Sequence, residues 1–420
     1  MQTNLADFIK NTAEGREADA ILRSCVHCGF CTATCPTYQL LGDELDGPRG
    51  RIYLIKQMLE GQPVSRLTQV HLDRCLSCRS CETTCPSGVK YHRLLDIGRG
   101  VIERRVPRSL VARTLRFLLC ELLPRPWIFT PAVKIGQWMR PLLPSVLADK
   151  VPPASSAARK PWPGKLQRAP ARRMIALAGC VQPALTPNTN AATARILHKL
   201  GIELFEVSGA GCCGALRYHL NAQGQALDDM RRLIDAWWPH IDDATSSGVE
   251  AIVMTASGCG AHVRAYGELL KHDPAYAAKA ARVSELTRDV SEVLAGEQDL
   301  LVDLLRQARS AATQTVAFHS PCTLQHGQKI QGVVESLLAA AGYTLSPVAD
   351  AHLCCGSAGT YSITQPELSR KLRDNKLAAL GAGSPAVFVT ANVGCQTHLQ
   401  GATATPVRHW VELIDERLNE

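Results

Sequence analysis

Two short stretches of the chain each carry four cysteines at one spacing. The first reads CVHCGFCTATCP from position 25, and the second reads CLSCRSCETTCP from position 75. Each follows the pattern C-x2-C-x2-C-x3-C-P, which puts three thiols on one tight loop and a fourth farther along. Three thiolates on one loop can bind three corners of an iron–sulfur cube, and the proline then turns the chain away. We therefore predict two [4Fe–4S] clusters.

The ligands of the two predicted clusters cross between the stretches. In bacterial ferredoxins with this spacing, the fourth cysteine of each run ligates the other cluster. The ligands expected for cluster 1 are Cys25, Cys28, Cys31 and Cys85. Those expected for cluster 2 are Cys35, Cys75, Cys78 and Cys81. Zinc is the alternative, but its sites are usually built from two C-x2-C pairs, so the repeated triplet favours clusters.

The second half of the chain contains an internal repeat marked by cysteines. In both copies, 31 residues lie between a first cysteine and a Cys-Cys-Gly sequence. The two copies are offset by 142 positions. Both copies also end alike, with AIVMTASGCGAH at 251–262 and AVFVTANVGCQTH at 386–398. The first set of cysteines is Cys180, Cys212, Cys213 and Cys259, and the second is Cys322, Cys354, Cys355 and Cys395. We call the two copies the first and second CCG units.

Short apolar segments in each CCG unit lead directly to the cysteines. The segments MIALA, IELFEV and AIVMT in the first unit, and TVAFH, YTLSPV and AVFVT in the second, are predicted strands. Helices are expected between them at 189–201 and 332–342. This alternation predicts parallel sheets, in which ligands gather beyond the carboxyl ends of the strands. All four cysteines of each unit are expected there.

Each set of four cysteines is a candidate site for a further iron–sulfur cluster. His262 and His398 are candidates for extra ligands or donors to a sulfur, and His319 for a supporting residue rather than a catalytic one. One alternative is a redox-active vicinal dithiol, and another is that one copy has lost its site and its cysteines are merely buried. The sequence GAGCCG at 209–214 imitates a dinucleotide-binding fingerprint, but the second copy reads DAHLCCG, so we exclude that interpretation.

Composition limits the other classes of function. The 420 residues include 17 cysteines, the first 20 residues are polar, and no run approaches a membrane span, so we expect a soluble or peripheral protein in a reducing compartment. Between residues 99 and 173 there are 16 Lys+Arg against 3 Asp+Glu. No nucleic-acid motif accompanies this charge, which leaves a solvated linker or a membrane or partner contact. The stretch 109–123 is a predicted helix packed on the next domain, with Cys120 as a small core residue, and a helix lying on a membrane surface is the alternative.

The predicted fold class is multidomain, α and α/β. A helical, bacterial-ferredoxin-type 2[4Fe–4S] module is expected at residues 1–105 and a basic, proline-rich linker at 106–170. Two duplicated α/β CCG units with parallel sheets are expected at 171–310 and 311–420.

The order of these parts resembles the iron–sulfur subunits of glycolate oxidase (glycolate dehydrogenase). The resemblance covers essentially the whole chain. Its most specific stretches, besides the first cysteine run through GDELDGPRGRIYLIKQ, are PNTNAATAR at 187–195, HLCCGSAGTY at 352–361 and TANVGCQTH at 390–398. The anaerobic glycerol-3-phosphate dehydrogenase iron–sulfur subunit, lactate-utilisation proteins and heterodisulfide reductase subunits are similar but more distant.

The resemblance implies a subunit that transfers electrons. FAD-containing subunits would oxidise glycolate to glyoxylate, and this chain would pass the electrons to a quinone from the cytoplasmic face of the inner membrane. Heterodisulfide reductases carry C-x-x-C at the end of each CCG unit, where this chain has CGAH and CQTH. This departure disfavours their five-cysteine cluster. A thiol–disulfide or quinone reductase acting at a CCG site is the alternative function.

Overall fold

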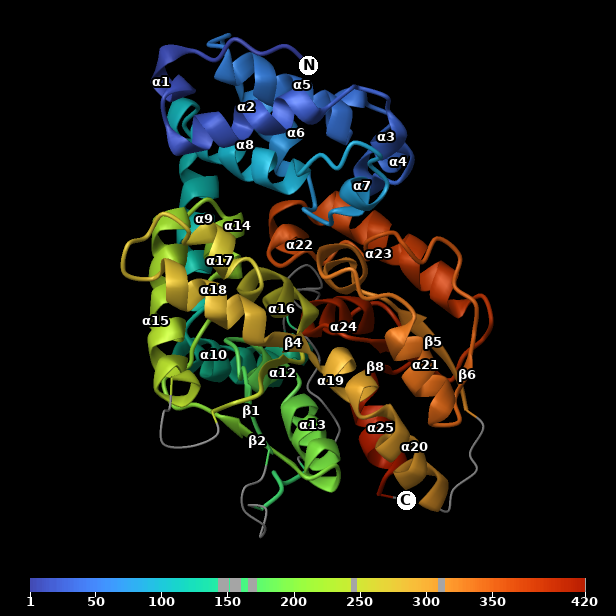
Figure 1. Ribbon diagram of the computed structural model, residues 1–420. Helices are drawn as coiled ribbons and strands as arrows, with labels where there is room; N and C mark the ends of the chain where they lie inside the picture. The colour runs from blue at the N-terminus through green and yellow to red at the C-terminus, as the bar shows by residue number, and fades with distance from the viewer. Residues whose placement is uncertain (143–150, 152–159, 165–171, 243–247, 309–313, 420) are drawn as a thin grey trace.

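The chain forms three bodies, one helical and two α/β. The computed structural model describes residues 1–142, 151, 160–164, 172–242, 248–308 and 314–419. In Figure 1 the helical N-terminal body lies at the top, with the two α/β bodies side by side below it. The predicted fold class is confirmed. The boundaries at residues 105, 170 and 310 remain a proposal, and the last two fall outside the described residues.

The N-terminal body consists of short helices joined by the two cysteine loops. Its helices are α1 (Asp7–Lys10), α2 (Ala13–Ser24), α3 (Phe30–Ala33), α4 (Pro36–Leu41), α5 (Pro48–Leu59), α6 (Arg66–Asp73), α7 (Ser80–Thr83) and α8 (Tyr91–Arg105). Thr12 caps α2, and Pro48 opens α5 at a position where a backbone N–H has no partner within the helix. Leu22, Ile55 and Leu94 are fully buried where α2, α5 and α8 pack together.

Each α/β body contains a four-stranded parallel sheet, as predicted. The strand orders are β2-β1-β3-β4 and β6-β5-β7-β8, so the two sheets share one topology. The strands are β1 (Arg172–Ala176), β2 (Ile202–Glu206), β3 (Ala251–Met254), β4 (Thr287–Asp289), β5 (Thr315–His319), β6 (Thr344–Leu345), β7 (Val387–Thr390) and β8 (Val407–His409). The edge strands β4 and β8 were not expected from the sequence, and this shared topology supports an origin by duplication.

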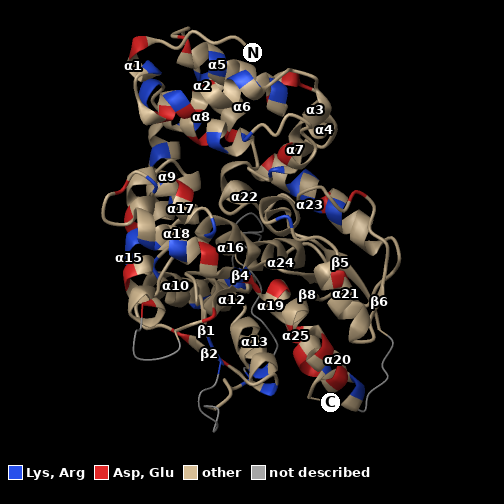
Figure 2. Ribbon diagram, viewed as in Figure 1, with Lys and Arg blue, Asp and Glu red and all other residues tan. Residues whose placement is uncertain are grey.

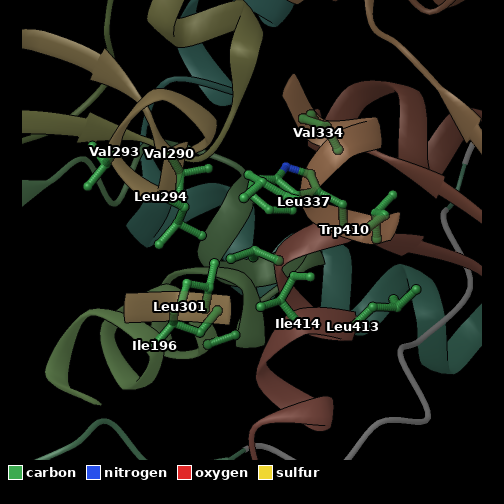
Figure 3. Packing of buried hydrophobic residues seen from close by; sticks show 14 of the residues in the cluster. Ile196, Val290, Val293, Leu294, Leu301, Val334, Leu337, Trp410, Leu413 and Ile414 are labelled. Carbon is green, nitrogen blue, oxygen red and sulfur yellow. The ribbon is translucent and has the colours of Figure 1, made fainter. Parts of the chain in front are cut away.

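Helices cover the sheets and join the two CCG units through one apolar core. In the first unit they are α12 (Gln182–Leu185), α13 (Asn188–Lys199), α14 (Ala215–His219), α15 (Gln223–Ile241), α16 (Ser257–Val263), α17 (Tyr266–Leu269), α18 (Ala277–Leu286), α19 (Val290–Gly296) and α20 (Gln298–Gln307). In the second they are α21 (Val333–Ala340), α22 (Tyr361–Thr364), α23 (Pro366–Gly381), α24 (Val393–Gln400) and α25 (Trp410–Arg417). Figure 3 shows Ile196 and Leu294 of the first unit near Leu337, Trp410 and Ile414 of the second, and all five are buried.

Polar contacts fix the carboxyl ends of the two sheets against each other. The backbone N–H of Ser257, just beyond β3, donates to the carbonyl of Ala391, just beyond β7, at 3.1 Å. His409 Nε2 contacts the carbonyl oxygen of Thr255 at 2.8 Å. Arg195 and Asp415 form a further ion pair at 2.6 Å. Because these contacts lie beside the strand ends, they hold the two cysteine sets in a fixed relation.

The N-terminal body sits on both CCG units. Arg93 Nη1 donates to Tyr218 Oη of the first unit at 3.0 Å. Tyr361 Oη of the second unit donates to the carbonyl of Arg74 at 3.0 Å. Figure 2 shows basic residues on α23, below the N-terminal body, and acidic residues on α20 and α25, near the C-terminus. The cluster loops are therefore directed at the CCG units rather than at solvent alone.

Two helices follow the N-terminal body, α9 (Leu110–Leu122) and α10 (Pro126–Met139). The predicted helix at 109–123 is confirmed, and Leu119 and Cys120 are buried against Leu220 of the first unit. Elsewhere each helix exposes an apolar stripe, which we call the α9–α10 face: Leu110, Val111, Phe117, Leu118, Trp127, Ile135 and Trp138, between 44% and 80% exposed. The expected packing on the next domain thus holds for only part of α9. No helix among the described residues has the length and apolar character to cross a bilayer.

Candidate functional site

The two cysteine runs fold into matching loops. In the first loop His27 and Gly29 have φ of 56° and 86°, and in the second Ser77 and Arg79 have φ of 54° and 61°. These positions flank the second cysteine of each run. Positive φ is uncommon for residues other than glycine, and it persists where the surroundings require it. The same left-handed turns at the same places curl both loops so that three thiols face one centre.

The loops enclose two small cavities, each lined by cysteines of both runs. One cavity, of about 30 Å³, is lined by Cys25, Cys28, Cys31, Cys81 and Cys85. The other, of about 20 Å³, is lined by Cys35, Cys75, Cys78 and Cys81. The fourth cysteine of each run, Cys35 or Cys85, thus faces the cavity of the other run. Cys81 borders both cavities, so the two sites are immediate neighbours.

The sulfur atoms have the surroundings that a bound cluster requires. Backbone N–H groups of Ser77 and Val89 donate to the sulfurs of Cys75 and Cys85 at 3.4 and 3.5 Å. Burial raises the pKa of Cys31 to about 11, so its thiolate is disfavoured without a cation. Bound iron would supply that positive charge, and hydrogen bonds to sulfur help to set its potential. The residues present therefore fit a pair of [4Fe–4S] clusters.

A buried ion network lies beside the second cavity. Asp46 and Arg51 are 0% and 1% exposed, and their closest charged atoms are 3.4 Å apart. His71 Nδ1 and Arg74 Nη1 also reach Asp46, at 3.0 and 2.8 Å. Thr37 Oγ1 donates to the carbonyl of Asp46 at 2.8 Å and is 3.3 Å from the sulfur of Cys35. Only the Thr37 side chain thus separates the positive guanidinium of Arg51 from the sulfur of Cys35, an expected cluster ligand. The spacing of residues in the sequence did not indicate this arrangement.

In the first CCG unit, the four predicted cysteines come together beyond the strand ends. Cys180 follows β1, Cys212 and Cys213 follow β2, and Cys259 lies in α16 after β3. All four line a cavity of about 550 Å³ among the described residues. The cavity offers ample room for a metal centre.

In the second CCG unit one pair of cysteines lies against the N-terminal body. The sulfurs of Cys322 and Cys354 are 3.9 Å apart and pack in one cluster with Leu76 and Cys78 of the N-terminal body. The side chain of Cys355 contacts both Cys354 and Cys395, and Cys395 lines the large cavity together with Cys322 and Cys354. The pair of Cys322 and Cys354 therefore lies directly against a predicted ligand of cluster 2.

The repeated Cys-Cys-Gly sequence has a steric explanation. Gly214 and Gly356 both have positive φ, 85° and 86°. A Cβ atom at either would lie 2.9 Å from the carbonyl oxygen of Ala226 or 2.6 Å from that of Ser369. Glycine is needed because the turn places backbone against a neighbouring helix. This supports the exclusion of a dinucleotide fingerprint.

The two candidate histidines have different surroundings. His398 lines the large cavity, and its Nε2 lies 3.2 Å from Ser369 Oγ. His262 is buried among the rings of Tyr218, His219 and Tyr266 and lines a smaller cavity shared with Cys78. His262 is therefore not among the residues that line the large cavity with the first cysteine set. A histidine that the sequence indicated only as a supporting residue, His319, is brought close to Cys355 and Cys395.

Comparisons with known proteins agree with this arrangement. A 4Fe-4S dicluster domain matches residues 21–89, and a cysteine-rich domain matches residues 175–264 and 316–400. The glycolate oxidase iron-sulfur subunit of Escherichia coli (strain K12) is 55% identical over 420 residues, which cover 100% of both chains. The chain belongs to this family. The predicted resemblance is confirmed, and so is the prediction of two [4Fe–4S] clusters.

More distant members of the family share less of the chain. A probable glycolate oxidase iron-sulfur subunit of Bacillus subtilis (strain 168) is 32% identical over 413 residues, covering 92% of this chain and 90% of the relative. Lactate utilization protein A of Bacillus licheniformis is 25% identical over 249 residues, covering 57% of this chain and 97% of the relative. The full-length match thus lies with the glycolate oxidase subunits.

Proposed function

We propose that the chain is the electron-transfer subunit of a glycolate dehydrogenase complex. FAD-containing partner subunits oxidise glycolate to glyoxylate, and this chain passes the electrons one at a time toward a quinone at the membrane. The observation that carries the proposal is the row of sites: two adjoining cluster cavities and, against Cys78 of the second, the sulfurs of Cys322 and Cys354. Clusters held in such a row supply one-electron carriers. The substrate is taken from the name of the full-length relative, a glycolate oxidase iron-sulfur subunit.

The ligand assignment within this function is also a proposal. Cluster 1 takes Cys25, Cys28, Cys31 and Cys85, and cluster 2 takes Cys35, Cys75, Cys78 and Cys81. In the first CCG unit, the four cysteines that line the large cavity are the ligands of a further iron–sulfur centre: Cys180, Cys212, Cys213 and Cys259. In the second unit, the buried His319 lies beside two of the cysteines, Cys355 and Cys395.

Reconstitution separates this function from thiol–disulfide reduction. The purified chain is expected to reduce a water-soluble quinone with glycolate only after the flavoprotein subunits are added. The alternative is favoured by the 3.9 Å approach of the Cys322 and Cys354 sulfurs, since a nearby dithiol can exchange with a disulfide. If the chain alone, reduced in advance with dithionite, cleaves glutathione disulfide and the flavoprotein adds nothing, the electron-transfer proposal is wrong.

The α9–α10 face supports attachment to the cytoplasmic face of an anionic membrane. It exposes Trp127 and Trp138 on α10, and Leu110 and Phe117 on α9, within a segment where Lys and Arg far outnumber Asp and Glu. Tryptophan is favoured at the lipid–water interface, and basic residues are attracted to anionic headgroups. An apolar stripe with basic neighbours is the pattern of a helix that lies on a bilayer rather than across it.

The double variant Trp127→Ala/Trp138→Ala is expected to weaken binding to vesicles of phosphatidylglycerol and phosphatidylcholine at least about tenfold, since each indole buries apolar surface in the interface. Sedimentation with the vesicles measures the bound fraction, which should also fall as salt is raised. Leu300→Ala is the control, because Leu300 is a 55% exposed apolar residue on the acidic helix α20. Equal binding of the double variant and the wild type would assign the face to a protein partner instead.

A further inference from the structure

Three side chains at the Cys-Cys-Gly loop of the second CCG unit form a buried group. One candidate ligand atom of each of His319, Cys355 and Cys395 lies within 4.8 Å of the others. The three residues are 2%, 0% and 5% exposed. They come from the end of β5, from the loop after β6 and from α24, so only the folded sheet brings them together.

The imidazole of His319 is buried without a partner. Neither Nδ1 nor Nε2 forms a hydrogen bond, although both atoms are inaccessible to solvent. A buried polar group is normally paired, and an exception calls for a further partner such as a bound ion. An imidazole whose ring nitrogens have no hydrogen-bond partner can offer a nitrogen lone pair to a cation. Thr390, the register partner of His319 on β7, also has a buried Oγ1 without a hydrogen bond.

The sulfur atoms near His319 are surrounded in a way that suits metal ligation. Asn392 Nδ2 lies 3.5 Å from the sulfur of Cys395, a contact that orients the thiolate. The 3% exposed Lys376 donates to the carbonyl of Asp350 at 2.7 Å. The interaction between the Lys376 ammonium and the sulfurs of Cys355 and Cys395 is attractive. The charges of two thiolates would balance the charge of a divalent ion. The ion and these two ligands together would therefore bring no net charge into the buried pocket.

The first CCG unit provides an internal comparison. With the offset of 142 positions, Leu177 stands where the second unit has His319. Cys213 and Cys259 therefore have no imidazole at that place. The two units keep the same topology and the same Cys-Cys-Gly turn, but only the second supplies a nitrogen donor. The units have accordingly diverged in what their cysteines can bind.

We propose that the second CCG unit binds a single zinc ion through His319, Cys355 and Cys395. One imidazole and two thiolates are a ligand set that zinc takes in tetrahedral sites, and three protein ligands leave its fourth position open. Cys322 and Cys354 are not part of this ligand set and pack against Cys78 of the N-terminal body. The inference goes beyond the proposed electron-transfer function and does not depend on it, because the zinc ion changes no oxidation state.

Metal analysis of the full-length chain tests the site. Protein purified without oxygen is expected to contain about one zinc atom per chain besides the iron and sulfide of its clusters. The variants His319→Gln and Cys395→Ser should each lower zinc at least tenfold and leave iron and acid-labile sulfide unchanged. His398→Gln is the matched control, since His398 lies in the same unit but outside the ligand set, and it should keep its zinc.

Cobalt provides a second readout that does not depend on activity. Chain loaded with Co²⁺ in place of zinc should show thiolate-to-cobalt absorption, which Cys355→Ser reduces and Cys213→Ser in the first unit does not. Absence of zinc from the wild type, with no cobalt absorption, would overturn the proposal. So would iron and sulfide that fall together in His319→Gln, because the site would then hold a cluster. Circular dichroism of each variant checks that a loss of metal is not a loss of fold.

Discussion

Cys35→Ala is expected to lower the iron of cluster 1 and cluster 2 together from about eight atoms to about four, and acid-labile sulfide in parallel. Cys35 belongs to the first cysteine run but faces the cavity lined by Cys75, Cys78 and Cys81. Its loss should therefore remove cluster 2 and leave cluster 1. Electron transfer to the quinone should fall by orders of magnitude, since the row of carriers is broken. Iron and sulfide analysis of anaerobic protein measures the effect.

Pairs of substitutions show which cysteines share a cluster. Cys35→Ala combined with Cys78→Ala should lose no more iron than either change alone, because both remove cluster 2. Cys35→Ala combined with Cys28→Ala should lose both clusters. Cys120→Ala is the control, since Cys120 is buried against Leu220 away from the cluster cavities and should leave iron unchanged. If the variant that combines Cys35→Ala with Cys28→Ala instead loses no more iron than either single variant, the two cysteines share one cluster and the crossed assignment is wrong.

Arg51→Met is expected to cost about 3–5 kcal/mol of folding free energy, the usual effect of removing one partner from a buried ion pair. Arg51 is 1% exposed, contacts Asp46 at 3.4 Å and donates to the carbonyl of His71 at 2.7 Å. Without it, the fully buried Asp46 carboxylate keeps Arg74 as its charged partner among the described residues, and His71 Nδ1 as a hydrogen-bond contact. Urea unfolding under anaerobic conditions, followed by circular dichroism, measures the loss.

The same change should make cluster 2 harder to reduce. A positive charge beside the cluster stabilises the added electron, and Arg51 reaches Thr37, which in turn contacts Cys35. The reduction potential from a redox titration should therefore fall. Arg49→Met is the matched control on the same helix, because the Arg49–Glu44 pair is more than one-third exposed and is worth about 1 kcal/mol or less. Equal losses of stability for the two variants would contradict the role assigned to the buried network.

The chain also shows which elements escape prediction. The edge strands β4 and β8 have only three residues each, TRD and VRH. Their polar residues do not resemble the apolar run that predicts a strand. A shared pattern was nevertheless present, since both segments carry Arg followed four residues later by Glu, with apolar residues behind it. That repeat would have extended the duplication to the last strand and helix of each unit. For α9 the sequence left packing on the next domain and a surface position as alternatives, because burial depends on which neighbour the helix meets.

The sequence by itself determined the two clusters, the duplication and the parallel sheets. Ligand spacing on a tight loop and apolar strand runs are local properties, so they can be read before folding. Only the tertiary structure decided that His319 lies beside two cysteines of the second CCG unit. The partners of His319 are 36 and 76 positions away along the chain, and no local spacing relates them. The pairing of β5 with β7 and the turn after β6 bring these atoms together, because residues distant in sequence meet at the carboxyl edge of a parallel sheet.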